Sequence, residues 1–320
     1  GSEAEGLAIA GVLPRADPHD AVVLPRPHAR ERTTVTASLD DLLRVLGPSP
    51  SIGTSSVRRI AQMTRLLPGA TFMPIRGNLD TRLRKVDAGE YDALVLAAAG
   101  LERLNLADRI SLRLPLDRAV PAPGQGIIAI EIREGDARVR AAVDVVTDRA
   151  AWAALDAERA LVEALGGGCQ TPIGAMAQPH GDGRLRLVAS VISLDGRELI
   201  HTTREGLTAE AVSLGRMVAQ ELLALGAGAI LEAAQKVTRF RAEIQQLKEE
   251  MQTLAGDRYP QLAEYVARFG TEQKRTRRGF QPLELPFANA VWDAGLWVSG
   301  ADPDLTFQEC IANASAGGVS

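Results

Sequence analysis

A run of hydroxyl and basic side chains, Thr-Ser-Ser-Val-Arg-Arg at 54–59, could bind an anion. Thr54, Ser55 and Ser56 favour a helix start, because their side-chain oxygens cap free backbone N–H groups. Those N–H groups carry partial positive charge and bind anions. Arg58 and Arg59 in the first turns oppose the helix dipole unless a negative group lies nearby. The run therefore predicts either a bound polyanion or a capped surface helix with two solvated arginines.

Three further arginines follow predicted strands of the same region. Arg76 follows the strand predicted at 71–75, Arg82 lies in the next helix, and Arg103 follows the apolar strand at 93–96. Loops after the carboxyl ends of parallel strands meet at one edge of a doubly wound sheet. Because guanidinium groups pair with carboxylates, a ligand with several carboxylates is expected there. The alternative is a set of surface arginines that pair with nearby Asp or Glu.

Cys169 directly follows three glycines, Gly166, Gly167 and Gly168. Glycines allow close approach of a ligand to the backbone and leave the thiol accessible. The alternative is a small buried hydrophobic residue. The chain has only two cysteines, which exclude a disulfide framework and a Cys-rich metal site, and no metal site is predicted.

Alternating strand and helix patterns indicate that an α/β domain positions these residues. Residues 121–126 are rich in proline and glycine and resemble a crossover between domains. The order helix, three strands, helix beyond it indicates a small α+β domain. The predicted elements are strands 50–53, 71–75, 93–96, 127–132, 171–177, 184–194 and 198–203, and helices 57–67, 78–86, 148–165 and 208–225.

Composition changes near residue 236. Only three of the 12 aromatic residues precede that point, and a short heptad-like apolar stripe follows it at Val237, Ile244, Leu247, Met251 and Leu254. The stripe is too short to indicate a coiled coil. The net charge of −4 argues against a chain that coats nucleic acid or an anionic membrane. No apolar run approaches the roughly 20 residues of a membrane span, and the first residues do not read as a signal peptide.

Together these segments resemble the porphobilinogen deaminase family from about residue 6 to residue 235. The motifs that carry the resemblance are Gly-Thr-Ser-Ser-Val-Arg-Arg at 53–59, Arg-Gly-Asn-Leu-Asp-Thr-Arg-Leu at 76–83, Gly-Glu-Tyr-Asp-Ala at 89–93, Ala-Gly-Leu-Glu-Arg-Leu at 99–104, Pro-Gly-Gln-Gly at 123–126 and Gly-Gly-Cys-Gln-Thr-Pro-Ile-Gly at 167–174.

The resemblance implies a hydroxymethylbilane synthase with a dipyrromethane cofactor held by a thioether to Cys169. Four porphobilinogen units condense in turn onto this cofactor with loss of ammonia, and water releases the product. A monomeric, cytoplasmic transferase with no nucleic-acid or membrane partner is expected. The residues implied to bind the cofactor and the growing pyrrole chain are Thr54, Ser55, Ser56, Arg58, Arg59, Arg76, Arg82, Gly100 and Arg103.

The implied fold is α/β, with hinged, doubly wound sheets like those of periplasmic binding proteins and a small α+β C-terminal domain. Domain 1 is expected to be incomplete. Its remnant is predicted at 1–28 and 127–145, followed by domain 2 at 29–126, domain 3 at 146–235 and an unassigned, mostly helical or irregular extension at 236–320.

One family feature has no counterpart in this sequence. The catalytic aspartate of the family belongs to a Lys-Asp-x-Pro motif upstream of the segment that matches Gly6. Asp17 and Asp20 match structural positions, so no catalytic residue is assigned and the chain is expected to be inactive as written. The alternatives are a non-catalytic polycarboxylate-binding protein, or a fusion whose tail is an interaction module. A thiol in a glycine loop argues against simple binding.

Overall fold

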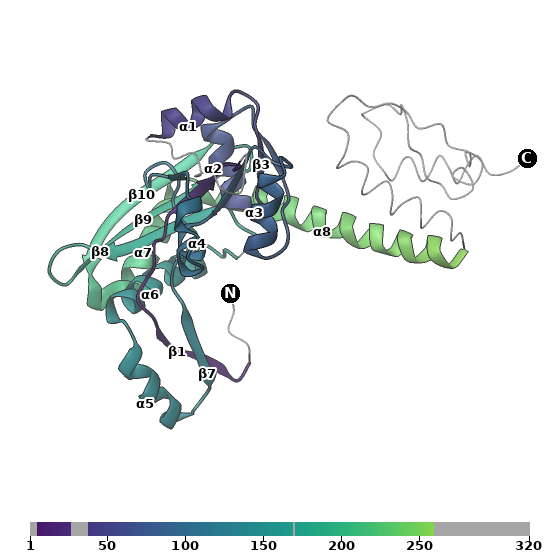
Figure 1. Ribbon diagram of the computed structural model, residues 1–320. Helices are drawn as coiled ribbons and strands as arrows, with labels where there is room; N and C mark the ends of the chain where they lie inside the picture. Colours follow the sequence, from purple (N-terminus) through teal and green to yellow (C-terminus); the bar gives the residue numbers. More distant parts are fainter. Residues whose placement is uncertain (1–4, 27–37, 169, 259–320) are drawn as a thin grey trace, which may run out of the picture. The chain divides into compact units, whose positions relative to one another are not determined.

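The computed structural model describes residues 5–26, 38–168 and 170–258 (Figure 1). The chain divides into two compact units, Gly1–Glu243 and Ile244–Ser320, and every predicted site residue belongs to the first. Cys169 and the segments 27–37 and 259–320 lie outside the described residues.

A five-stranded sheet carries the arginine motifs. Its order is β4 (Thr71–Met73), β3 (Ser51–Gly53), β5 (Ala93–Ala97), β2 (Asp20–Val23) and β6 (Leu112–Arg113). Strand β3 is parallel to both β4 and β5, as expected, whereas β2 is antiparallel to β5 and β6. The sheet is therefore mixed. Although β2 belongs to the segment 1–28 by sequence, it lies inside this sheet.

Helices cover both faces of the sheet because β5 is apolar on both sides. Leu94 and Leu96 pack with residues of α3 (Leu79–Asp87) and α4 (Ala98–Arg103). Val95 packs on the opposite face with residues of α1 (Leu39–Leu46) and α2 (Val57–Leu66). A continuous apolar strand is typical of a sheet buried on both faces. The result is the predicted α/β layering.

Side-chain caps fix where the helices of this domain begin. The Ser56 hydroxyl accepts a hydrogen bond from the Arg59 backbone N–H, and the Asn78 side chain accepts one from Thr81 N–H at 2.9 Å. Both caps satisfy donors that the first turn leaves free. The helix starts predicted from the Ser/Thr cluster and from Asn78 are confirmed.

A second, two-stranded sheet pairs β1 (Leu7–Val12) with β7 (Ala129–Arg133) in antiparallel orientation. Helix α5 (Ala137–Val146) packs on it through a small core of Ala10, Ile132 and Val143. The segments predicted as the remnant of domain 1 therefore meet in space. A short 3-10 helix, Ala107–Arg109, precedes β6.

The third sheet has the order β10 (Leu199–Leu207), β9 (Arg184–Ile192) and β8 (Ile173–Pro179), all antiparallel. Helices α6 (Arg149–Ala164) and α7 (Ala211–Ala224) pack on one face, and a 3-10 turn, Thr208–Glu210, joins β10 to α7 (Figure 1). The predicted order of helix, three strands and helix is confirmed.

Helix α8 (Ala227–Arg258) crosses the predicted boundary at 235 without a break. Ile230, Leu231 and Ala234 of its first turns are buried in the core of the third sheet. The side chains of Ile244, Leu247, Met251 and Leu254 lie outside the described residues, so the apolar stripe stays a prediction.

Two further properties of the described residues concern membranes and metal ions. No single helix is long and apolar enough to cross a membrane, and one pair, Thr208–Ala224 with Ala227–Phe240, meets the length and composition criteria only together, with a bend of 87°. Within that part of the chain, no three His, Cys, Asp or Glu side chains form a group that could hold a metal ion.

Candidate functional site

The loops after β3, β4 and β5 leave the same edge of the five-stranded sheet, because the three strands are adjacent and parallel. Ser55 joins two of these loops: its hydroxyl donates to Ile75 C=O and accepts from Ile75 N–H, both at 3.1 Å. Tyr91 adds a hydrogen bond from its hydroxyl to Pro74 C=O at 3.2 Å. The three arginine-bearing loops therefore converge, as the sequence predicted.

Asp20, at the start of β2, lies between the two adjacent arginines of α2. Its carboxylate is 2.6 Å from Arg58 Nη1 and 2.8 Å from Arg59 Nε. Only 1% of the Asp20 side chain and 4% of the Arg58 side chain are exposed. Burial opposes ionisation of Asp20, but the two guanidinium charges outweigh it and lower the pKa of the carboxyl group.

Arg58 is buried and has several partners, and neither arginine is a solvated surface group. Arg58 also donates to Gln62 Oε1 at 3.0 Å and to Val120 C=O at 2.8 Å. Arg59 is more exposed, and its remaining contacts, to Val95 C=O and Gln125 Oε1, are long at 3.3 Å. Of the two, Arg59 has the freer guanidinium group for an added ligand.

The crossover 121–126 is tied to the same carboxylate. Gln125 Nε2 donates to Pro18 C=O at 2.6 Å and to Asp20 Oδ1 at 3.1 Å. Arg103 donates to Gly126 C=O at 2.7 Å. Gly126 has a φ of +85°, and a Cβ there would lie 2.4 Å from Ala16 C=O, so only glycine fits. The crossover is thus held against the arginine loops.

Positive charge at this edge exceeds what nearby side chains neutralise. Arg76 is exposed and forms no ion pair or hydrogen bond with any residue in the described ranges. Within the part of the chain that the structure describes, Arg82 donates one side-chain hydrogen bond, to Gly77 C=O at 2.9 Å. Burial and the charges of Arg58 and Arg82 together lower the pKa of Arg59, although Asp20 opposes this. An added anion would relieve that repulsion.

The remaining predicted residues surround the same edge. Thr54 is buried, and its hydroxyl accepts from Ser56 N–H at 3.3 Å. Gly100 lies on α4 with open space where a side chain would project. Cys169 is outside the described residues, and of its neighbours Thr171 Oγ1 donates to Gly168 C=O at 2.6 Å. A Cβ at Gly167 would lie 2.4 Å from Ile173 Cδ1, so the end of that side chain would have to move.

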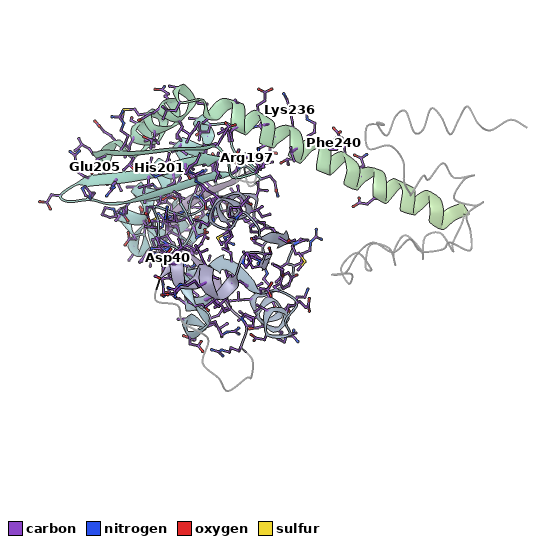
Figure 2. All side chains as sticks on the ribbon, turned by 90° about the horizontal axis from the view of Figure 1, so that it is seen from above. Asp40, Arg197, His201, Glu205, Lys236 and Phe240 are labelled. Carbon is purple, nitrogen blue, oxygen red and sulfur yellow. The ribbon has the colours of Figure 1, made fainter. Side chains whose placement is uncertain are left out.

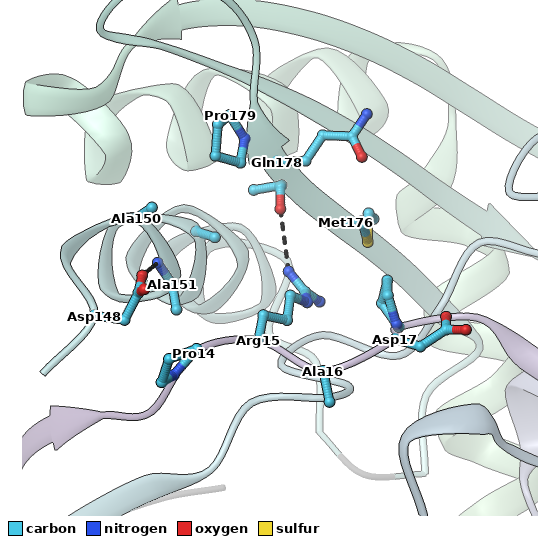
Figure 3. Close-up of a pocket in the computed structure, with 13 residues that line it drawn as sticks. Pro14, Arg15, Ala16, Asp17, Asp148, Ala150, Ala151, Met176, Gln178 and Pro179 are labelled. Carbon is cyan, nitrogen blue, oxygen red and sulfur yellow. Dashed lines mark hydrogen bonds between the residues drawn. The ribbon is translucent and has the colours of Figure 1, made fainter. Parts of the chain in front are cut away.

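A second ion pair, Arg15 with Glu158, was not found from the sequence. The two groups lie 2.6 Å apart, and Glu158 is buried in α6. Glu158 also accepts from Ala177 N–H at 2.6 Å and Gly124 N–H at 2.5 Å, while Arg15 donates to Ala177 C=O at 3.1 Å (dashed in Figure 3). Burial outweighs Arg15 and raises the pKa of Glu158. At the edge of β8 the pair binds the N–H and C=O of Ala177, the backbone groups that a neighbouring strand would otherwise bind.

A pocket of about 330 Å³ lies beside this ion pair (Figure 3), and none of the five predicted arginines lines it. Pro14, Met176 and Pro179 line it together with alanines of α6. Two of its polar lining residues have protein partners: Asp148 caps α6, and Asp17 accepts from Arg113. The pocket is therefore a gap beside a junction, and its chemistry does not match the predicted ligand.

Two family models match the chain: porphobilinogen deaminase, dipyrromethane cofactor binding domain, over residues 2–141, and porphobilinogen deaminase, C-terminal domain, over residues 152–224. A porphobilinogen deaminase from Thiobacillus denitrificans is 41% identical over 228 residues, 71% of this chain and 70% of the relative. The chain belongs to the porphobilinogen deaminase family.

Other deaminases of the family match to a similar extent. The one from Bordetella parapertussis is 46% identical over 220 residues, 69% of this chain and 66% of its own length. The one from Roseiflexus castenholzii is 45% identical over 217 residues, 68% of this chain and 67% of its own length. The chain thus spans about two thirds of these curated relatives. Residues 225–320 lie outside both family models.

The family assignment agrees with the geometry. All five predicted arginines fall inside the range matched by the dipyrromethane cofactor-binding model, and Cys169 falls inside the C-terminal one. A dipyrromethane carries several carboxylates. The unpaired Arg76, the repulsion between Arg59 and Arg82 and the open space at Gly100 fit such a group. The described residues therefore suit the cofactor that the family model names.

Proposed function

We propose that this chain binds a dipyrromethane cofactor at the β3–β4–β5 edge and belongs to the step that condenses porphobilinogen into hydroxymethylbilane in tetrapyrrole biosynthesis. The carrying observation is the excess of positive charge on three converging loops inside the cofactor-binding range. Bound dipyrromethane would supply the pyrrole carbon to which the first unit is added, and each later unit would add to the terminal pyrrole of the growing chain.

Arg76, Arg82 and Arg103 are proposed to pair with the acetate and propionate groups of the pyrroles. Arg59 contributes a fourth cation, held in position by Asp20 at 2.8 Å. Backbone N–H groups at the start of α2 add neutral donors, and Ser55, whose hydroxyl is bound to Ile75, positions the loop that carries them. Arg58 is proposed to act indirectly: buried against Asp20, it fixes the helix that presents Arg59. The Cys169 thiol is proposed to form the thioether.

The catalytic carboxylate remains unassigned, and we propose that the 320-residue chain does not turn over by itself. A carboxylate must stabilise positive charge on the pyrrole nitrogens during condensation. Asp20 already serves Arg58 and Arg59. Asp17 accepts from Arg113 and His19, both at 2.6 Å. Neither is available for a pyrrole, which supports the expected inactivity.

The hinged, binding-protein-like architecture is also part of the proposal. Two linkers run side by side between the two-stranded and five-stranded sheets, joined by hydrogen bonds from Leu13 N–H to Ile128 C=O and from Ala16 N–H to Gly126 C=O, both 3.0 Å. Paired linkers of this kind support hinge motion. One chain is proposed to form one cofactor site, working in the cytoplasm without nucleic acid or membrane.

A turnover assay tests the catalytic part of this proposal. Purified chain that carries the cofactor is incubated with porphobilinogen, and hydroxymethylbilane formation is measured beside a full-length family member. We expect no product above background. Normal product formation would refute the inactivity. If the chain binds pyrroles but dialysis then removes them, no thioether is involved. That result would favour the alternative of a non-catalytic polycarboxylate-binding protein.

A further inference from the structure

The turn between β9 and β10, residues 193–198, is held in shape by its own hydrogen bonds. The Ser193 hydroxyl donates to Asp195 Oδ1 at 2.5 Å, and the same oxygen accepts from Arg197 N–H at 3.1 Å. Glu198 N–H donates to Ser193 Oγ at 2.9 Å, and Ser193 N–H donates to Glu198 C=O at 2.8 Å. Figure 2 labels Arg197, which belongs to this turn. The turn therefore presents a fixed surface to the element that packs on it.

Gly196 belongs to this turn and is buried against α2. Its φ is +71°, and a Cβ there would lie 2.8 Å from Ala61 C=O and 2.9 Å from the backbone nitrogen of Arg65. Because both atoms are backbone, they cannot rotate away as a side chain would. Arg65 Nη1 also donates to the carbonyl oxygens of Gly196 and Arg197, at 3.4 and 3.3 Å. The turn therefore packs directly on the backbone of α2.

A second connection joins α2 to the third sheet through the chain just before the crossover. Val120 C=O accepts from Arg58 Nη1 at 2.8 Å and from Gln62 Nε2 at 3.1 Å. The next carbonyl along the chain, that of Pro121, accepts from Ala175 N–H of β8 at 2.9 Å. Two successive carbonyl groups thus bind α2 on one side and the outer edge of β8 on the other. Helix α2 is connected to the third sheet at two separate places.

These contacts account for a polar yet largely covered face of α2. The four residues that make them share one face of the helix, because the later ones follow the first at three, four and seven positions. They are Arg58, Ala61, Gln62 and Arg65, and the first three are buried. Arg59, a residue of the proposed ligand site, directly follows Arg58. The helix that presents Arg59 is therefore held along one face by contacts that lead to the third sheet.

We propose that Gly196 and Arg65 are positioning residues, which fix α2 on the third sheet. Cys169 lies just before β8 of that sheet in the sequence. The contact therefore sets the position of Arg59 relative to the proposed attachment point, although neither positioning residue touches the ligand. The nature of the ligand rests on the proposed function, whereas the contact between the turn and α2 can be tested without any ligand.

Hydrogen exchange of the full chain, read by mass spectrometry, measures how firmly α2 is held. Gly196→Ala forces a Cβ against the backbone of α2. Gly181→Ala is the matched control, because Gly181 lies in the β8–β9 turn with a φ of +70° and nothing within 4 Å of an added Cβ. Arg65→Ala removes the side-chain contact, and Arg65→Lys keeps a cation that can donate to the same carbonyls. A second readout is the share of chains that carries a pyrrole adduct in intact mass spectrometry.

We expect the amides of α2 to exchange about tenfold faster in Gly196→Ala and about threefold faster in Arg65→Ala, because local opening of the helix costs less free energy once the contact is lost. Gly181→Ala and Arg65→Lys should exchange as the unaltered chain does. Exchange in β5 and β8 should stay the same in all four variants, which separates loosening of α2 from unfolding of the whole unit. The share of chains with the adduct should fall in the two variants whose α2 is loosened.

Unchanged exchange of α2 in Gly196→Ala, or an equal increase in Gly181→Ala, would overturn the proposal. If Gly196→Ala speeds exchange throughout the chain, the two Arg65 variants decide by the same criteria. Faster exchange of α2 with an unchanged share of adduct would overturn the positioning role. An unaltered chain without any adduct would refute the proposed function instead, and exchange alone would then decide whether the turn holds α2.

Discussion

Asp20 supplies the negative group that two adjacent arginines in a first turn require. The need for such a group follows from the sequence, because Arg58 and Arg59 oppose the helix dipole. Its source does not, since Asp20 lies 38 residues from Arg58 and on another element. The sequence predicts either a bound polyanion or two solvated surface arginines, and a buried carboxylate of the chain itself was not among these alternatives. One carboxylate of the chain meets part of that need, and Arg59, Arg76 and Arg82 are the arginines that we propose bind the ligand.

Removing the Asp20 charge should destabilise the fold strongly. Asp20→Asn leaves two guanidinium groups without a counterion, one of them buried, and the expected loss of unfolding free energy is about 3 kcal/mol. Asp41→Asn breaks an exposed pair with Arg44 and should cost about 0.5 kcal/mol or less. Urea denaturation of both variants measures the difference. Equal, small losses would contradict the role given to Asp20.

The same carboxylate should shape the acid side of the stability curve. The pKa of Asp20 is lowered in the folded chain from the ordinary 3.8, so its contribution is present above that pH and is lost as pH falls through the folded value. Unfolding free energy should therefore fall steeply below about pH 4. The Asp20→Asn variant should show a shallower fall in a pH series of melts. If the unfolding free energy falls equally steeply with pH in both proteins, Asp20 does not make this contribution.

Individual elements followed from local sequence far better than their pairing did. Ser56 and Asn78 cap the helices whose starts they predicted, and the apolar run in β5 is buried on both faces. Strand β2 was not separated from the segment 1–28, because its antiparallel place beside β5 depends on tertiary contacts. The Arg15–Glu158 pair was missed for the same reason: nothing near either residue signals the other.

Glu158 should matter because it holds several elements at once. Glu158→Ala removes acceptors from Arg15, Ala177 N–H and Gly124 N–H in a buried site. The expected loss is about 3 kcal/mol of unfolding free energy. Glu158→Gln should be milder, because it keeps one acceptor and removes a charge whose raised pKa shows that burial disfavours it.

Urea denaturation measures these losses, and Glu163→Ala on the exposed part of the same helix is the control. A loss for Glu158→Ala no larger than that of the control would contradict a joint at this position. A loss for Glu158→Gln equal to that for Glu158→Ala would instead show that the charge itself is needed there.

At the scale of the whole molecule, the change in composition near 236 does not coincide with a break in structure. Helix α8 continues through it, and its first turns are part of the core of the third sheet. The family model ends earlier, at residue 224, and the second compact unit begins at Ile244. The aromatic content of the chain changes near residue 236. Helix α8 continues there because the residues before and after position 236 both favour a helix.

The central claim is that the arginine edge holds a dipyrromethane joined to Cys169. Intact mass spectrometry tests it most directly on full-length chain from a host that makes porphobilinogen and hydroxymethylbilane, so that attachment does not depend on turnover by this chain. Cys169→Ser is the control for the attachment point. The double variant Arg76→Gln/Arg82→Gln removes two of the arginines proposed to bind the pyrrole carboxylates. Because both lie at the edge of the sheet, the variant should have the same melting temperature as the unaltered chain. Arg84→Gln is its exposed control on α3.

We predict that the chain and Arg84→Gln carry a covalent adduct of two pyrrole units, or of four where hydroxymethylbilane attaches whole with loss of water. Cys169→Ser should carry none, and Arg76→Gln/Arg82→Gln should be modified several-fold less. An unmodified mass for the unaltered chain would contradict the account.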